Sequence, residues 1–141
     1  MLSDRHSEPQ DDESADRFVL FSKHLFKAGG VKPNAFVPHP YNDLSVTRAT
    51  ETEDHEIWKI GGEIAGSLNR TLYGAARAVV KTYRTEGLEV VASPIPEGDA
   101  VHPNGNPNHA DVKSWPTDKK DQKAIALKIA HAATLRTPPA T

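Results

Sequence analysis

The 141-residue chain contains no cysteine, which excludes disulfide frameworks and zinc sites built from thiolates. It also lacks any run of eighteen apolar residues, the length that a helix needs to cross a bilayer. Its N-terminus is acidic and carries no basic segment followed by an apolar one, the pattern of a secretion signal. We therefore predict a cytoplasmic protein that makes no contact with membranes.

Motifs of high specificity are missing as well. The sequence has no Walker loop, no glycine fingerprint for dinucleotides, no HExxH and no nucleophile elbow. A metal site assembled from Asp99, His102, His109 and Asp111 would match no familiar ligand spacing. We predict neither a metal nor a cofactor.

Apolar residues are also scarce, at 37% of the chain, and the N-terminal segment accounts for part of this deficit. Six of the 19 acidic residues lie within the first seventeen positions, which contain almost nothing apolar. Such a segment does not bury enough surface to offset its ordering entropy. We predict a disordered acidic arm at 1–16, a single domain at 17–137 and a tail at 138–141. Without the arm the chain is mildly basic, which hints at a masked anion-binding face.

Hydrophobic periodicity predicts the elements of the domain. Short branched or alternating runs predict strands at 18–21, 44–48, 88–93 and 109–115. Apolar residues at helical spacing predict one helix that follows Thr50, a second over 71–86 and a third over 118–135. Fifteen residues rich in proline and glycine, 94–108, form a long loop. The order predicts an α+β fold: a mostly antiparallel sheet of about four strands with three helices packed on one face.

Two of these elements carry polar residues that suggest a function. In the strand at 109–115, His109, Asp111 and Lys113 form a polar row that ends at Trp115, and the row is either an ordinary wet face or the floor of a cleft. On the helix at 71–86, a stripe of cations is either solvated or in contact with phosphates; its members are Arg77, Lys81 and Arg84. Arg48 ends an apolar strand face and lies either at the rim of the fold or in a site.

Two hypotheses from different classes follow. The first is a non-catalytic accessory module that binds a polyanion such as nucleic acid, or a partner protein in a larger bacterial assembly. Its candidate binding residues are Lys23, Lys32, Arg77, Lys81, Arg84 and Asp111. The second is a small metal-independent nuclease or hydrolase, in which His109 and His24 act as base and acid beside Arg48 and Lys113. Because no catalytic motif is present, we favour the binding module.

Two segments resemble stretches of a family of small, uncharacterised bacterial proteins. The first is Val31-Lys32-Pro33 with Ala35-Phe36; the second is His109-Ala110-Asp111-Val112 with Trp115-Pro116 and Asp118-Lys119. The resemblance covers roughly residues 17 to 137. It implies a bacterial cytoplasmic origin and carries no activity, cofactor or site residue.

Overall fold

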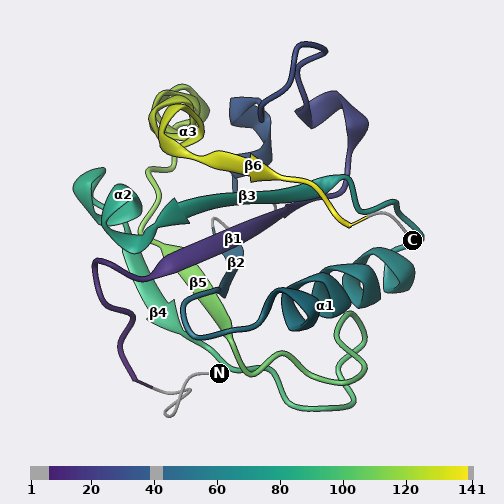
Figure 1. The fold of residues 1–141 in the computed structure, drawn as a ribbon. Coiled ribbons are helices and arrows are strands. Elements are labelled where there is room, and N and C mark those ends of the chain that lie inside the picture. Colours follow the sequence, from purple (N-terminus) through teal and green to yellow (C-terminus); the bar gives the residue numbers. More distant parts are fainter. Residues whose placement is uncertain (1–6, 39–42, 140–141) are drawn as a thin grey trace.

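The computed structural model of the protein describes residues 7–38 and 43–139. It has an α+β fold, in which a single antiparallel sheet combines with three helices (Figure 1). The sheet has six strands in the order β4-β5-β2-β1-β3-β6. The predicted fold class is therefore confirmed, with six strands where the sequence suggested about four.

The elements follow the chain in a mixed order. The strands are β1 (Ser14–Val19), β2 (Leu44–Arg48), β3 (Gly74–Val79), β4 (Glu89–Ala92), β5 (His109–Lys113) and β6 (Thr134–Arg136). The helices are α1 (Asp54–Ser67), α2 (Val80–Thr85) and α3 (Lys119–Ala132), with 3-10 turns η1 (Ser22–His24) and η2 (Pro33–Phe36). No helix in the described part of the chain is long and apolar enough to cross a membrane.

The two faces of the sheet are covered by different helices. Ala15 and Val19 of β1 point into the main hydrophobic core, which α3 and η2 close. Phe18 points to the opposite face because successive strand side chains alternate, and there it meets Gly61 of α1. The prediction that all three helices lie on one face is thus wrong for α1 (Figure 1).

Gly61 shows how closely α1 approaches the sheet. A Cβ atom at this position would lie 2.7 Å from Cε1 of Phe18, whereas one at Gly62 would meet nothing within 4 Å. The structure shows that only Gly61 is needed for packing, and that its neighbour is an aromatic ring.

The segment predicted as one helix over 71–86 is instead β3 followed by the short helix α2. β3 lies between β1 and β6, so both of its edges are paired, and two adjacent residues that point to opposite faces are both buried. Ala75 and Ala76 are fully buried, and a Cβ at Gly74 would lie 2.6 Å from the carbonyl oxygen of Arg136. Small residues are required here by close packing, and packing overrides the helix propensity of alanine.

The acidic N-terminal segment is part of the fold wherever the structure describes it. β1 begins at Ser14, so the predicted boundary at residue 17 is wrong for 14–16. Glu13 pairs with Arg48 and Asp16 with Arg77, and all four side chains are buried or half-buried. Strand pairing with β3 and buried ion pairs thus hold in place a segment that composition predicts to be disordered. Residues 1–6 of the predicted arm and 140–141 of the predicted tail lie outside the described residues.

The last helix also differs from its prediction. It ends at Ala132, before the predicted residue 135, and its N-cap is Asp118, whose side chain accepts a hydrogen bond from the backbone N–H of Lys120. Ala126 and Ile129 face the core while Leu127 is exposed, so the helix buries one stripe and is not buried over most of its circumference. β6 follows directly and was not predicted, because it is only three residues long.

Candidate functional site

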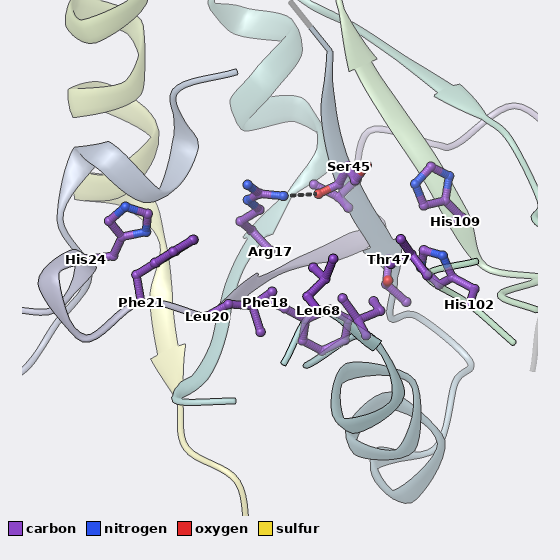
Figure 2. Close-up of a pocket in the computed structure, with 13 residues that line it drawn as sticks. Arg17, Phe18, Leu20, Phe21, His24, Ser45, Thr47, Leu68, His102 and His109 are labelled. Carbon is purple, nitrogen blue, oxygen red and sulfur yellow. Dashed lines mark hydrogen bonds between the residues drawn. The ribbon is translucent and has the colours of Figure 1, made fainter. Parts of the chain in front are cut away.

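A cavity opens where the two central strands separate. β1 and β2 are paired only at Ala15 with Arg48 and at Asp16 with Thr47, and the strands diverge beyond these pairs. The cavity encloses about 260 Å³ and is bordered by η1, the C-terminal end of α1, the loop before β5, and β5 itself (Figure 2). Its apolar wall includes Phe18, Leu20, Phe21, Val46, Ile64 and Leu68, and its polar groups are Arg17, His24, Ser45, Thr47, His102 and His109.

Arg17 occupies the place where the β1–β2 ladder would have continued. Its Nη1 donates to the carbonyl oxygen of Ser45 in β2 at 3.2 Å, and its Nε donates to the carbonyl oxygen of Ala35 at 2.9 Å. Within the described part of the chain, no carboxylate lies within the 4.0 Å ion-pair distance of this guanidinium. Burial lowers the pKa of Arg17, yet arginine stays protonated at neutral pH. The cavity therefore contains a positive charge that donates hydrogen bonds to neutral carbonyl groups and has no ion pair in the described part of the chain.

His109 holds one imidazole in a fixed orientation. Its Nδ1 lies 3.0 Å from the carbonyl oxygen of Ser93 and 2.8 Å from the hydroxyl of the same residue. A carbonyl oxygen only accepts, so we assign the proton to Nδ1 and the lone pair to Nε2, which lies 3.9 Å from a carboxylate oxygen of Asp111. The ring is buried, so at His109 the polar row is not an ordinary wet face.

The electrostatics of His109 favour its neutral form. Burial lowers the pKa of His109, although the charge of Asp111 and the hydrogen bond to Ser93 act in the opposite direction. The ring of His102 meets it edge to face at 5.9 Å between centroids. His102 is itself held by Asp99, whose carboxylate oxygen lies 3.3 Å from Nδ1 of His102. No group of three metal-ligating residues forms among the residues that the structure describes.

His24 reaches the cavity from η1, on the other side of Arg17. Its ring lies against that of Phe21, with 5.1 Å between centroids. Burial lowers the pKa of His24, and the positive charges of Arg17, Lys23 and Lys32 lower it further. The site thus combines a permanent cation with His24 and His109, whose lowered pKa values favour the neutral imidazole near pH 7.

The structure brings together some of the predicted catalytic residues and separates others. His24 and His109 line one cavity from different sides, and Arg17 stands between them in Figure 2. Arg48 does not line it: only 1% of Arg48 is exposed, and its guanidinium forms a bidentate pair with Glu13. The interpretation of Arg48 as a rim residue is wrong. Lys113 lies at the far end of β5 from His109 and is not among the lining residues.

The predicted cationic stripe does not exist, because its residues are not on one helix. Arg77 lies in β3, where Asp16 accepts two hydrogen bonds from it at 2.7 and 2.9 Å. Arg84, in α2, pairs with Asp11 at 2.8 Å, and Glu8 lies 3.6 Å away. Lys81 is exposed. The other predicted binding lysines are Lys23, within η1, and Lys32, directly before η2, and both lie over aromatic rings.

Arg17 is the residue of the site that the sequence analysis did not identify. It was interpreted only as the first residue of the folded domain. A usable signal was nevertheless present: no aspartate or glutamate occurs between Asp16 and Asp43, so the cations of this stretch have no local carboxylate partner.

Comparison with protein-family models, with curated proteins and with solved structures finds no match to this chain.

Proposed function

We propose that the protein is a non-catalytic binding module whose ligand is a small amphipathic anion. The cavity would hold the apolar body of the ligand against Phe18, Ile64 and Leu68, and its carboxylate or phosphate group at Arg17. The observation that carries this proposal is the guanidinium of Arg17, which faces a largely apolar cavity without a carboxylate partner among the described residues. A partly buried charge without a counterion is unfavourable, and an anionic ligand would supply the missing charge.

The form of this proposal differs from the one suggested by sequence. Binding of a polyanion through the predicted stripe would need free cations at Arg77 and Arg84, and carboxylates neutralise both. A cavity of about 260 Å³ instead lies just below the roughly 300 Å³ at which ligand pockets begin, so it has room for a small molecule only. A partner protein in an assembly remains compatible with a module that also binds a small anion.

A second candidate is the metal-independent hydrolase or nuclease. It is favoured by one observation, the lone pair that the hydrogen bond to Ser93 leaves on Nε2 of His109, which is the state required of a general base. Acid–base cleavage also needs a protonated imidazole, and the pKa of His24 is lowered as well. Because both lowered pKa values favour the neutral ring near pH 7, we rank catalysis second to binding.

Isothermal titration calorimetry with three ligands of equal chain length tests the proposal. Octanoate and octyl phosphate carry the two candidate anionic groups, and octan-1-ol is the neutral control. We expect at least one anion to bind tenfold or more tightly than the alcohol, and the difference between the anions identifies the preferred group. Equal binding of all three ligands would contradict a role for Arg17.

Leu68 offers a matched pair of variants for the same experiment. It borders the cavity and is 46% exposed, so both changes should leave the fold intact. Leu68→Gln and Leu68→Glu have nearly the same shape and differ in charge, so only the glutamate should repel the anion. Lys123→Gln on α3 controls for loss of a remote charge. The hydrolase would instead be supported if the protein cleaves p-nitrophenyl phosphate or RNA, and if both His24→Ala and His109→Ala abolish this activity.

A further inference from the structure

We infer that a second cleft, next to the cavity and separate from it, binds single-stranded nucleic acid. This cleft encloses about 490 Å³ and is open to solvent. Its lining includes Phe21, Lys23, Asn69, Arg70, Thr71 and Tyr73. Leu20 and Phe21 line both spaces and so form the wall between them. The inference concerns a different ligand class from the small anion proposed above.

The arginines of the molecule single out this cleft. Four of the six described arginines pair with carboxylates: Arg48, Arg77, Arg84 and Arg136. The other two are Arg17, in the cavity, and Arg70, in the cleft. Lys23 also has no carboxylate within ion-pair distance in the described part of the chain, and none lines the cleft. The two described arginines that lack an ion pair thus lie at these neighbouring spaces.

The sequence explains why Lys23 and Arg70 have no carboxylate partner. The cleft is built from two stretches without any aspartate or glutamate, one between Asp16 and Asp43 and the other between Glu63 and Glu86. The second stretch also contains Arg77 and Arg84, which are neutralised by the acidic residues before and within β1. Lys23 and Arg70 lie at the opposite end of β1 and β3 from those carboxylates. Their charge is therefore available to a polyanion.

Aromatic rings accompany the cations in the cleft. The guanidinium carbon of Arg70 lies 4.3 Å from the centroid of Phe21, and Nζ of Lys23 lies 5.5 Å from the same centroid. A guanidinium stacked on a ring has a second, outer face on which a base can stack. Tyr73 is 36% exposed and offers a further ring. Beyond η1, Phe26 is 51% exposed with Lys32 above it, which extends the same pattern.

This combination fits single strands better than other polyanions. Cations that follow the backbone, together with rings on which bases stack, are the features of single-strand binding sites. In a duplex the base faces are stacked on one another and are not available to Tyr73 or Arg70. A bilayer is broad and flat, and would leave the amide and hydroxyl groups of the concave wall, at Asn69, Thr71 and Ser22, without partners.

Fluorescence anisotropy tests the inference, with a labelled 20-nucleotide single strand of mixed sequence, as RNA and as DNA, and a duplex of the same sequence as probes. We expect the single strand to bind at low salt at least fivefold more tightly than the duplex. Arg70→Gln and Lys23→Gln should each lower the slope of log affinity against log salt by about 0.7. Tyr73→Ala should weaken binding about tenfold and leave the slope unchanged, because stacking releases no counterions.

Lys81→Gln is the matched control, since Lys81 is exposed but lies outside the cleft. It should change neither affinity nor slope. Arg70→Gln should leave octanoate binding unaltered, so a failure at the cleft is distinguishable from a failure at the cavity. No binding of either strand at low salt, equal affinity for the duplex, or no effect of Tyr73→Ala would overturn the inference. Binding of phosphatidylglycerol vesicles without binding of oligonucleotides would also overturn it, in favour of a membrane surface.

Discussion

Replacement of Glu13 by glutamine should destabilise the protein strongly, although composition places this residue in a dispensable arm. Glu13 is 6% exposed and Arg48 1% exposed, and two hydrogen bonds of 2.9 Å join their side chains. Glutamine keeps the shape but loses the charge, and it turns an amide donor toward donors of Arg48. Loss of one partner of a buried ion pair costs about 3 kcal/mol. At roughly 3 °C per kcal/mol, the melting temperature should fall by about 10 °C.

Urea denaturation followed by the fluorescence of Trp58 and Trp115 measures this loss. The double variant Glu13→Leu with Arg48→Met is the control, because replacing both charges by apolar groups of similar size is often neutral or stabilising. It should recover most of the stability that either single change removes. A Glu13→Gln protein within about 0.5 kcal/mol of the parent, the range of ordinary surface changes, would refute the reasoning. It would also restore the view that the N-terminal segment is dispensable.

Acid titration gives an independent check on the same pair. Burial alone would raise the pKa of Glu13, but the hydrogen bonds from Arg48 and from the backbone of Gln10, with the charge of Arg48, outweigh it and lower the pKa. The unfolded chain therefore binds the proton more readily than the folded one. The stabilisation by this pair is complete above the unfolded pKa of about 4.3 and is lost as the pH falls through the lowered folded value.

Three further outcomes are expected. Gly61→Ala should cost roughly 1–3 kcal/mol of unfolding free energy, because its Cβ would lie 2.7 Å from the Phe18 ring, while Gly62→Ala should stabilise by up to about 1 kcal/mol. Urea titrations that show a stabilising Gly61→Ala and a destabilising Gly62→Ala would contradict the packing of α1. Trp115→Ala should cost about 3–5 kcal/mol, since the indole is buried and donates to a backbone carbonyl; a tolerated change would mean that the ring is not structural. Between pH 7.5 and 5.5 the free energy of unfolding should fall, because the pKa of His109 is lowered in the folded state and the unfolded chain therefore takes up more protons. Octanoate should nevertheless bind more tightly at pH 5.5, because protonation adds positive charge to the cavity. A fall in both stability and octanoate affinity would refute the assignment of His109 as a neutral, buried imidazole.

Local patterns predicted the strands with strong alternation or branched residues. Leu44–Arg48 and His109–Lys113 form strands as expected, and Ala110 and Val112 point into the core as their alternation predicts. The long irregular loop before His109 is also as predicted, apart from one isolated bridge between Ile95 and Asn106. These elements could be predicted from the sequence because their buried side chains are the ones that the local pattern of apolar residues indicates.

The failures have a common physical cause, which is packing between distant segments. Gly74–Val79 is rich in alanine and therefore suggested a helix, but it lies in a layer where both faces are covered and only small residues fit. Arg48 and Glu13 are 35 positions apart, so their pairing cannot be read from local pattern. The same limit applies to the site: sequence supplied His24 and His109 as candidates, and only the fold shows that Arg17 joins them in one cavity.

The separation of β1 from β2 also has a mechanical consequence. The sheet consists of two three-stranded halves, β4-β5-β2 and β1-β3-β6, and its register joins them at only two residue pairs, whereas six pairs join β1 to β3. Motion of one half against the other would change the width of the cavity while each half keeps its own ladder intact. A ligand bound at Arg17 would contact both halves of the sheet and restrict their relative motion. The sheet would therefore be more rigid when the cavity is occupied than when it is empty.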